Sequence, residues 1–214
     1  MSILIYGAGQ IGAVVASVLY ECGQEIVGFI DDREEALGSK VAGLTVLGNR
    51  AWLLKNCGKN QVCNAIGGIQ SRKAVAAFLD EAGILTVGAI HPTVIISPEV
   101  CIGPDVIVGA GSVLFGHVSI GRGCYIGPSV TVSHNTVVGN WVLLSVGTVV
   151  GARVDVSDEV FVGTASTLMV PGFGENERLK IGHSAVVGAG SLVLRDVPER
   201  QTVIGRPAKK LEKG

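Results

Sequence analysis

The sequence predicts a chain of two parts: a small Rossmann-like βαβ domain over residues 1–87, then a left-handed parallel β-helix over residues 88–205. Two patterns predict this fold. A six-residue repeat fills the second half, and a glycine-rich strand–turn–helix motif opens the first. The composition agrees, because 31 of the 214 residues are glycine and only 5% are aromatic. Glycine weakens helices and serves turns, so this balance favours a repetitive β architecture over a helical bundle.

The repeat emerges when the chain is cut into sixes from Gly88. Fourteen consecutive hexads, ending at residue 171, carry Ile, Val or Leu at the third position, from Ile90 to Leu168. The fourth position is usually Gly or Ser, which fits a sharp corner with little room for a side chain. We expect each aliphatic residue to point into a narrow prism and to stack on its equivalents in neighbouring coils. Three hexads make one triangular coil.

The period fails over residues 172–180, a polar stretch that contains glycine and that we expect to loop out from the β-helix. The period resumes at Ile181, with Val187 and Val193 as further inward residues. Residues 206–214 leave the pattern again, and we expect this tail to cap the last coil.

A glycine-rich turn follows the first predicted strand, which covers residues 2–6. The turn reads Gly-Ala-Gly-Gln-Ile-Gly over residues 7–12, a helical pattern follows, and a second strand over residues 25–30 ends at Asp31 and Asp32. This is the G-x-G-x-x-G fingerprint in its strand–turn–helix setting, with an acid about 20 residues further on. Its glycines let the backbone approach a phosphate, and the helix N-terminus supplies N–H donors.

A third predicted strand, residues 62–66, leads into Gly67 and Gly68, a second point where a ligand can approach the backbone closely. The fingerprint by itself indicates NAD and an NAD-dependent oxidoreductase. Length disfavours that reading, because barely 85 residues precede the repeat and a dinucleotide fold has two halves. One half-site holds one nucleotide.

Charge and cysteine content exclude several kinds of partner. With 17 basic and 18 acidic residues, net charge −1, the chain has no electrostatic footprint for nucleic acid or an anionic membrane. Its five cysteines are scattered without a CxxC pair, which is typical of reduced, buried thiols in a cytoplasmic protein without a metal site. The chain opens on a strand-like run and has no apolar stretch of spanning length. We therefore predict a cytoplasmic protein.

Together the two parts resemble one family of sugar O- and N-acetyltransferases. It includes the sialic acid O-acetyltransferases and the nucleotide-linked amino-sugar N-acetyltransferases of the bacillosamine and perosamine pathways. The resemblance covers essentially the whole chain and rests on GAGQIG, the FIDD strand end, NAIGGIQSR, IHPTVIISP, VSHN and IGRPAKKL. It implies acetyl-CoA as the acyl donor, bound along the β-helix between neighbouring subunits of a homotrimer. It also implies a nucleotide-sugar substrate in the N-terminal domain.

The resemblance further implies a general base, a histidine on a mid-helix coil that Asp or Glu usually follows. The matching pair here is His134 and Asn135. Three departures from the family pattern stand out: the acid is an amide, Leu143 replaces a histidine often found near the thioester, and Gln10-Ile11 replaces a first-loop histidine. Histidine suits the removal of an amine proton because its ordinary pKa lies near working pH. Asn135 can orient the ring through its carbonyl oxygen but brings no charge.

The remaining site residues fall into two groups by resemblance and motif. The group expected along CoA comprises Leu143, Ser145, Gly147, Gly151, Thr164 and Ala189. The group expected at the nucleotide-sugar comprises Gly7, Gly9, Gln10, Ile11, Asp31, Asp32, Gly67 and Gly68.

The predicted function is therefore an acetyl-CoA-dependent N-acetyltransferase that acts on a nucleotide-linked amino sugar for bacterial surface-polysaccharide synthesis. Two alternatives remain open at this point. One is O-acetylation of a sialic acid or related sugar. The other is a non-catalytic protein that binds a nucleotide-sugar or CoA, which the amide at position 135 and the missing histidine at position 143 both suggest.

Overall fold

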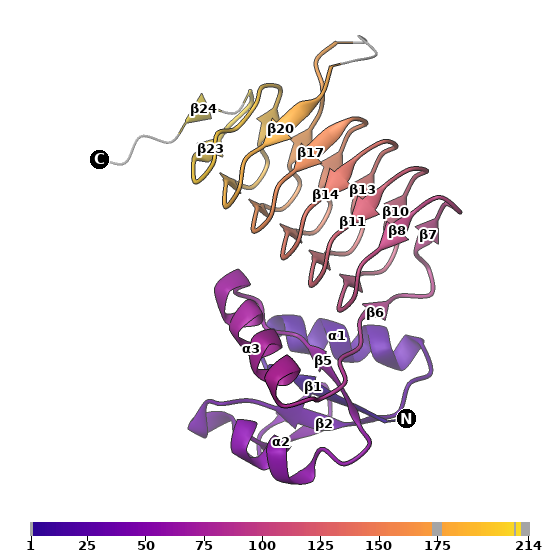
Figure 1. Ribbon diagram of the computed structural model, residues 1–214, viewed down its shortest axis with the longest axis vertical. Helices are drawn as coiled ribbons and strands as arrows, with labels where there is room; N and C mark the ends of the chain where they lie inside the picture. Colours follow the sequence, from indigo (N-terminus) through magenta and orange to yellow (C-terminus); the bar gives the residue numbers. More distant parts are fainter. Residues whose placement is uncertain (1, 173–176, 208, 211–214) are drawn as a thin grey trace. The chain divides into compact units, whose positions relative to one another are not determined.

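The computed structural model describes residues 2–172, 177–207 and 209–210, and its contacts divide the chain into two compact units, Met1–Pro92 and Thr93–Gly214 (Figure 1). The division lies five residues beyond the predicted boundary at residues 87/88. The reason is local: β6 (Ala89–Ile90) lies against α1 (Gln10–Glu21), and the Cys22 thiol donates to the Ile90 carbonyl at 3.1 Å. The first hexad therefore packs with the first unit.

The first unit is an α/β sheet with strand order β3-β4-β2-β1-β5 in the described residues. The strands are β1 (Ile3–Tyr6), β2 (Ile26–Ile30), β3 (Lys40–Val41), β4 (Leu44–Gly48) and β5 (Gln61–Asn64). Strands β4, β2, β1 and β5 are parallel, and β3 adds an antiparallel hairpin to β4. β1 lies between β2 and β5, and its four residues are buried because both faces of a parallel sheet are covered.

Three α-helices accompany this sheet: α1, α2 (Arg50–Asn56) and α3 (Ile69–Glu81). α1 begins directly after the glycine-rich turn, and its buried positions include Val15, Val18 and Leu19, at the three- and four-residue spacing of one helix face. Asn49 caps α2, because its side chain accepts hydrogen bonds from the amides of Ala51 and Trp52.

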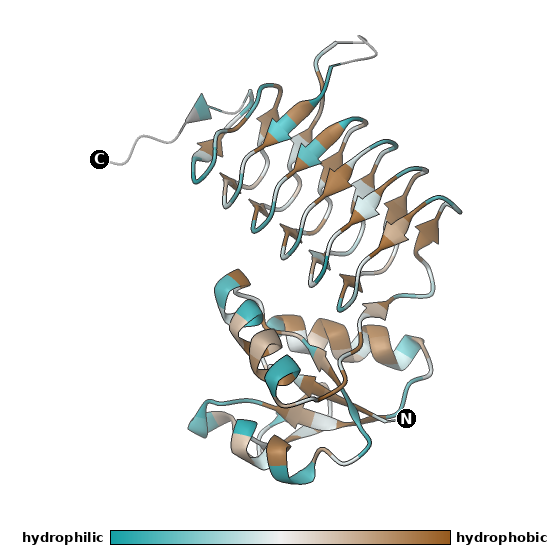
Figure 2. Ribbon diagram, in the orientation of Figure 1, coloured by the Kyte–Doolittle hydropathy of each residue, from teal (hydrophilic) through white to brown (hydrophobic). Residues whose placement is uncertain are grey.

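The second unit is a three-sided left-handed parallel β-helix. Strands on one side pair with residues 18 positions away, as in Val113 with Thr131, so one coil holds three hexads as the repeat predicted. Figure 2 shows hydrophobic strands separated by more hydrophilic corners. The first side consists of β7 (Ile95–Ile96), β10 (Val113–Leu114), β13 (Thr131–Val132), β16 (Val149–Val150), β19 (Thr167–Leu168) and β22 (Leu192–Val193).

The other two sides are built in the same way. One consists of β8 (Cys101–Ile102), β11 (Ser119–Ile120), β14 (Val137–Val138), β17 (Val154–Val156) and β20 (Leu179–Ile181). The other contains β9 (Ile107–Val108), β12 (Tyr125–Ile126), β15 (Leu143–Leu144), β18 (Phe161–Val162), β21 (Val186–Val187), β23 (Thr202–Ile204) and β24 (Lys209–Lys210).

The third hexad position fills the core, as predicted, from Val108 to Leu168. Ile96, in the first coil of the unit, is 39% exposed. The first hexad position is buried too, which the sequence analysis did not anticipate. Several of these positions hold hydroxyl residues, and each hydroxyl bridges two coils: Ser112 donates to the Gly127 carbonyl at 2.9 Å and accepts from the Val130 amide at 3.2 Å.

From Asp105 to Ala165, the sixth hexad position turns each corner in a left-handed backbone conformation. Positive φ angles recur there whatever the side chain, including 57° at His117, 58° at Asn135 and 58° at Arg153. Glycine occupies the same position at Gly111, Gly123 and Gly147. The geometry of the coil therefore imposes this conformation on residues that seldom adopt it.

The predicted loop at 172–180 ends earlier than expected, because β20 begins at Leu179, whose side chain is buried in the core of the β-helix. Residues 173–176 of that loop lie outside the described residues. In the tail predicted at 206–214, β24 pairs antiparallel with β23, while residues 208 and 211–214 also lie outside the described part.

Candidate functional site

His134 and Asn135 occupy an exposed corner of the β-helix after β13. The Nδ1 atom of His134 lies 2.8 Å from the Oδ1 atom of Asn135. An amide oxygen only accepts a hydrogen bond, so Nδ1 donates in this contact, and in the neutral ring Nε2 then carries the lone pair. Asn135 thus orients the ring through its carbonyl oxygen, the role the sequence analysis assigned to it.

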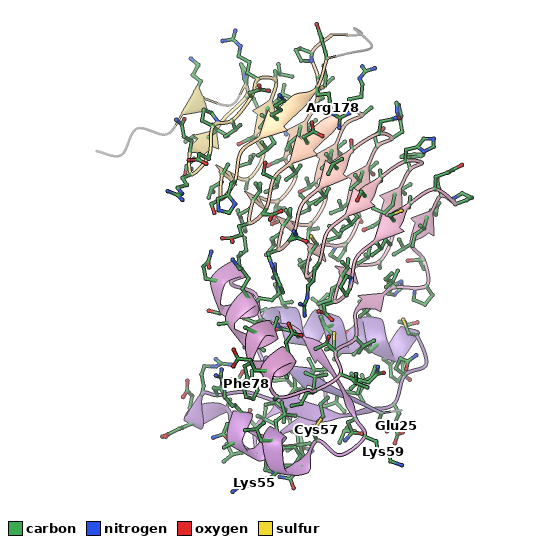
Figure 3. All side chains as sticks on the ribbon, in the orientation of Figure 1. Glu25, Lys55, Cys57, Lys59, Phe78 and Arg178 are labelled. Carbon is green, nitrogen blue, oxygen red and sulfur yellow. The ribbon has the colours of Figure 1, made fainter. Side chains whose placement is uncertain are left out.

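Residues C-terminal to this corner, Arg153 and Arg178, donate hydrogen bonds to its backbone carbonyls. The amide of Arg153 donates to the His134 carbonyl at 3.2 Å, and a guanidinium nitrogen of Arg178 donates to the Asn135 carbonyl at 3.0 Å. Arg178, which is labelled in Figure 3, also pairs with Asp155 of β17 through both carboxylate oxygens. The segment leading into β20 is therefore fastened to the coil that carries the candidate base. The sequence analysis missed Arg178, because its partners lie 23 and 43 residues away.

The residues predicted along CoA lie on two different edges of the prism and on one strand. We name the corner residues 115–117, 133–135 and 151–153 the His134 edge, and the corner residues 145–147, 163–165 and 188–190 the Thr164 edge. Ser145, Gly147, Thr164 and Ala189 share the Thr164 edge, where successive corners bond, as in Gly190 N–H to the Thr164 carbonyl at 2.7 Å. Gly151 lies on the His134 edge, and Leu143 is buried at the start of β15.

The glycine-rich turn shapes the start of α1 in the first unit. Gly7 has a φ of 110°, and a Cβ atom at Gly12 would collide with the Gly7 carbonyl oxygen. Gly9 is the N-cap of α1 and makes no side-chain capping bond. No side chain of the N-cap therefore competes with an anion for the first-turn N–H groups, which include those of Gln10 and Ile11.

The second glycine pair, Gly67 and Gly68, lies close to this turn. A Cβ atom at Gly67 would come within 3.2 Å of the Ile11 side chain. Buried Arg72 donates to the carbonyls of Ile66 and Gly67, and Asn64 bonds the Arg72 carbonyl at 2.9 Å. The structure therefore brings both predicted glycine segments together at the carboxyl ends of β1 and β5.

Asp31 follows β2 and is almost fully engaged by the protein. It accepts hydrogen bonds from the Ala8 amide at 2.8 Å, from the Arg33 amide at 3.0 Å and from two guanidinium nitrogens of Arg33 at 2.9 Å. These bonds, first among them those of the Arg33 side chain, lower the pKa of Asp31 to about 2. Asp31 thus joins the glycine-rich turn to Arg33.

Asp32 is engaged as well. Tyr6 Oη donates to it at 2.6 Å, and the backbone amide and side chain of Arg50 donate at 2.9 and 3.0 Å. Burial raises the pKa of Asp32, but the bonds from Tyr6 and Arg50 outweigh it, and the pKa lies below its ordinary value. Burial, together with the bond to Asp32, raises the pKa of Tyr6 to about 12.

A cavity of about 570 Å³ opens beside these carboxylates. Its lining residues come from the end of β2 and the turn after it, from β4 and from α2: Asp31, Asp32, Arg33, Glu34, Leu37, Leu47, Gly48, Asn49 and Trp52. Arg33 and Trp52 were missed in the sequence analysis. An arginine directly after the acid pair was the available signal for Arg33.

Among the described residues, no group of three His, Cys, Asp or Glu side chains is placed to hold a metal ion. Within the same residues, no helix combines the length and the apolar character needed to cross a membrane.

Two known domain families match the chain. The PglD N-terminal domain matches residues 2–79, and the GMPPB C-terminal domain matches residues 79–172. No curated protein sequence matches the chain.

Solved structures match over nearly its full length. PerB from Caulobacter crescentus, in complex with CoA and GDP-perosamine, is 28% identical, with 99% of this chain and 98% of that chain covered and a TM-score of 0.89. The acetyltransferase domain of PglB from Neisseria gonorrhoeae, in complex with acetyl coenzyme A, is 27% identical, with 98% of each chain covered and a TM-score of 0.88.

A third structure is a variant of perosamine N-acetyltransferase from Caulobacter crescentus, in which a histidine is replaced by asparagine, in complex with CoA and GDP-perosamine. It is 29% identical, with 100% of this chain and 98% of that chain covered and a TM-score of 0.71. Domain order, fold and full-length likeness agree: the chain is similar along nearly its whole length to N-acetyltransferases of nucleotide-linked amino sugars, and its first part matches the PglD N-terminal domain.

Proposed function

We propose that the chain transfers an acetyl group from acetyl-CoA to the amine of a nucleotide-linked amino sugar. The observation that carries the proposal is the His134–Asn135 pair, a ring fixed through Nδ1 with Nε2 free at an exposed corner. Two solved structures of the same fold support the proposal: PerB binds CoA and GDP-perosamine, and the acetyltransferase domain of PglB binds acetyl coenzyme A. The chain also carries a glycine-rich turn and a cavity suited to a nucleotide in its first unit.

The chemistry follows from that geometry. The neutral amine nitrogen attacks the thioester carbonyl carbon, and Nε2 of His134 accepts the proton that the nitrogen loses. The carbon–sulfur bond of the tetrahedral intermediate then breaks, and the proton passes to the departing CoA sulfur. Asn135 keeps Nδ1 protonated and the ring in place throughout. An amide carries no charge, so Asn135 stabilises the imidazolium less than a carboxylate would.

We further propose that the active site is completed by a second copy of the chain in a homotrimer. The His134 edge and the Thr164 edge flank the same side of the prism, the side of β7 to β22. Three prisms with that side turned toward a threefold axis place the His134 edge of one subunit beside the Thr164 edge of the next. Exposed apolar residues on and beside this side support the arrangement: Ile95, Phe115, Val146, Val149 and Met169.

In this arrangement CoA extends along the Thr164 edge, in contact with Ser145, Gly147, Thr164 and Ala189. Gly151, on the His134 edge, and Leu143, an apolar residue, belong to the thioester end. The nucleotide-sugar binds residues of the 1–87 domain: the phosphates lie at Gly7, Gly9, Gln10 and Ile11, and Gly67 and Gly68 approach the ligand from the other loop. Asp31 and Asp32 border the nucleoside.

The five cysteines, scattered along the sequence without a CxxC pair, support a cytoplasmic location. We propose that the enzyme acts there in the synthesis of bacterial surface polysaccharide.

A thiol-release assay tests the function. The protein is mixed with acetyl-CoA and a panel of GDP-, UDP- and dTDP-linked amino sugars, each paired with the same sugar lacking the amine. We expect release only with amino sugars, and a product that resists hydroxylamine because an amide, unlike an ester, does not react with it. A hydroxylamine-sensitive product would indicate O-acetylation, and no release with any sugar would contradict the proposal.

A further inference from the structure

We infer that Arg33 reads a guanine base in the cavity beside Asp31, so that the nucleotide of the substrate is GDP. This inference rests on the proposed function and specifies its substrate class. It is carried by the fixed geometry of the Asp31–Arg33 pair and by the cavity that this pair borders.

The cavity has the size and the walls of a base-binding pocket. Its volume of about 570 Å³ exceeds what one planar base fills. Trp52 packs directly on Gly48, where a Cβ atom would collide with its side chain, so the indole lies against the end of β4. Leu37, 63% exposed, and Leu47 add apolar surface. Apolar and aromatic walls of this kind stack on a base of any identity, so identity must be read by polar groups.

Arg33 is the polar group held in position to distinguish one base from another. Its Nε and one Nη2 hydrogen bond the two oxygens of Asp31, each at 2.9 Å. The guanidinium is thereby fixed in plane while its side chain stays 56% exposed. Asp31 occupies one edge of the fork, and in the part of the chain that the structure describes no other group bonds Nη1. The opposite edge, formed by Nη1 and the second Nη2 hydrogen, remains available for two parallel hydrogen bonds.

Guanine is the base that matches this edge. Its O6 and N7 are adjacent acceptors at the spacing of an arginine fork, and this bidentate contact is the commonest specific one to guanine. Adenine presents a donor beside N7, which a fork of donors repels. Uracil and thymine present one carbonyl beside an N–H. Cytosine also has two adjacent acceptors, O2 and N3, but unlike guanine it has no pair of N–H donors for the carboxylate of Glu34. The two carboxylates to which a base could otherwise donate already accept hydrogen bonds from the protein. Asp31 accepts from Ala8 and Arg33, and Asp32 accepts from Tyr6 and Arg50.

Glu34 supplies the complementary acceptor. It lines the same cavity next to Arg33, and its carboxylate is exposed. Guanine carries N1–H and N2–H donors on the edge next to O6, and a carboxylate accepts from both. A pocket with a guanidinium and a carboxylate side by side therefore offers partners to both edges of guanine.

Calorimetric titration of the full-length protein with nucleoside diphosphates tests the assignment without any mutation. We expect GDP to bind at least about tenfold more tightly than CDP, UDP, dTDP or ADP, the discrimination of one good bidentate pair. We also expect 7-deaza-GDP, which lacks the N7 acceptor, to lose most of that advantage. Equal binding of GDP and UDP, or of GDP and 7-deaza-GDP, would overturn the guanine assignment.

The variant Arg33→Lys completes a double-mutant cycle. Lysine keeps the charge but loses the fork, so GDP binding should weaken about tenfold while UDP binding changes little. GDP and 7-deaza-GDP should then bind the variant equally, because the atom removed from the ligand and the group removed from the protein are partners. Lys55→Arg, on α2 outside the cavity, is the control and should bind GDP like the unmodified protein.

The two hypotheses fail in different ways. If UDP or dTDP binds best, the nucleotide-sugar function stands and the base assignment is wrong. If no nucleoside diphosphate binds while the protein is folded, the proposed function itself fails.

Discussion

Asn135 meets two requirements at one corner of the β-helix. Its φ of 58° lies in the left-handed region, where asparagine is among the best tolerated residues after glycine. Its side-chain oxygen holds Nδ1 of His134 at 2.8 Å. The amide that departs from the family's acidic pattern is therefore compatible both with the corner and with orientation of the base.

Replacing the base should affect catalysis and leave acetyl-CoA binding largely intact. We expect His134→Ala to lower kcat by about 10²–10⁴, the usual contribution of a general base, with little change in KM for acetyl-CoA. Steady-state kinetics check this. The control is His183→Ala, at the same hexad position on another edge, which should keep full activity. An unchanged rate in His134→Ala would mean that water or the substrate removes the proton.

Variants at residue 135 separate orientation from charge. Asn135→Gly keeps the left-handed corner without strain and removes the orienting oxygen, so kcat should fall, by less than in His134→Ala, while the melting temperature holds. Asn135→Asp adds a negative charge that favours protonated His134, so the acidic limb of the rate profile should move to higher pH. A limb that stays in place in Asn135→Asp would show that His134 does not set it.

Asp31 should make the first unit sensitive to acid. Its folded-state pKa of about 2 lies below the ordinary value near 3.9, so folding favours the carboxylate. Its stabilisation, about 2 kcal/mol, is fully present above about pH 5 and is lost as the pH falls toward 2. Between about pH 6 and 3, the protection factors of the β1 and β2 amides, which correct for the slower intrinsic exchange in acid, should therefore fall less in Asp31→Asn than in the unmodified protein. Glu21→Gln, on the exposed face of α1, should behave like the unmodified protein.

At the scale of the coil, the inward direction of the third hexad position was predictable, because a hydrophobic core requires an aliphatic residue there in every hexad. The sixth position could not be predicted in this way. It holds Asp105, His117, Trp141 and Glu159 as well as glycines, because the closed coil, and not residue preference, enforces the left-handed corner. The hydroxyls of the first position were missed for a related reason: their partners are carbonyls 15 residues onward, visible only once coils stack.

These buried hydroxyls should contribute measurably to stability. Ser112 is fully buried and satisfies both the Gly127 carbonyl and the Val130 amide. Ser112→Ala should therefore lower the free energy of unfolding by about 1–3 kcal/mol. Ser119→Ala, the same change at an exposed outward position of β11, should stay within about 0.5 kcal/mol. Urea denaturation compares the two variants, and equal midpoints would mean that the hydroxyl bridges contribute nothing.

The candidate site was predictable where a motif fixes local geometry and not where partners come from distant coils or strands. The glycine-rich turn placed Gly7 and Gly9 at the end of β1 from spacing alone. The sequence could not show that Asp32 is occupied by Arg50, 18 residues on, or that Asp31 serves to orient Arg33. For the same reason the sequence could not show that protein groups already bond both carboxylates of the acid pair.

At the scale of the whole molecule, the side of β7 to β22 combines uncharged outward positions with exposed apolar residues. The outward residues of its described strands are Ile95, Val113, Thr131, Val149, Thr167 and Leu192, without a charge among them. Ile95 and Val149 are 64% and 41% exposed in the single chain. Covering such a surface with second copies would remove apolar area from water, and the His134 edge and the Thr164 edge flank this side.

A mixing experiment tests whether the active site is shared between subunits. One variant, His134→Ala, lacks the base, and another, Ala189→Trp, blocks the Thr164 edge where we place CoA. Each should be inactive as a homotrimer. After unfolding and joint refolding at equal concentrations, three quarters of random trimers are mixed, and each mixed trimer regenerates one intact site in three. The mixture should then recover about a quarter of the unmodified rate. If both edges served one active site within the same chain, every site would carry a defect and the mixture would stay inactive.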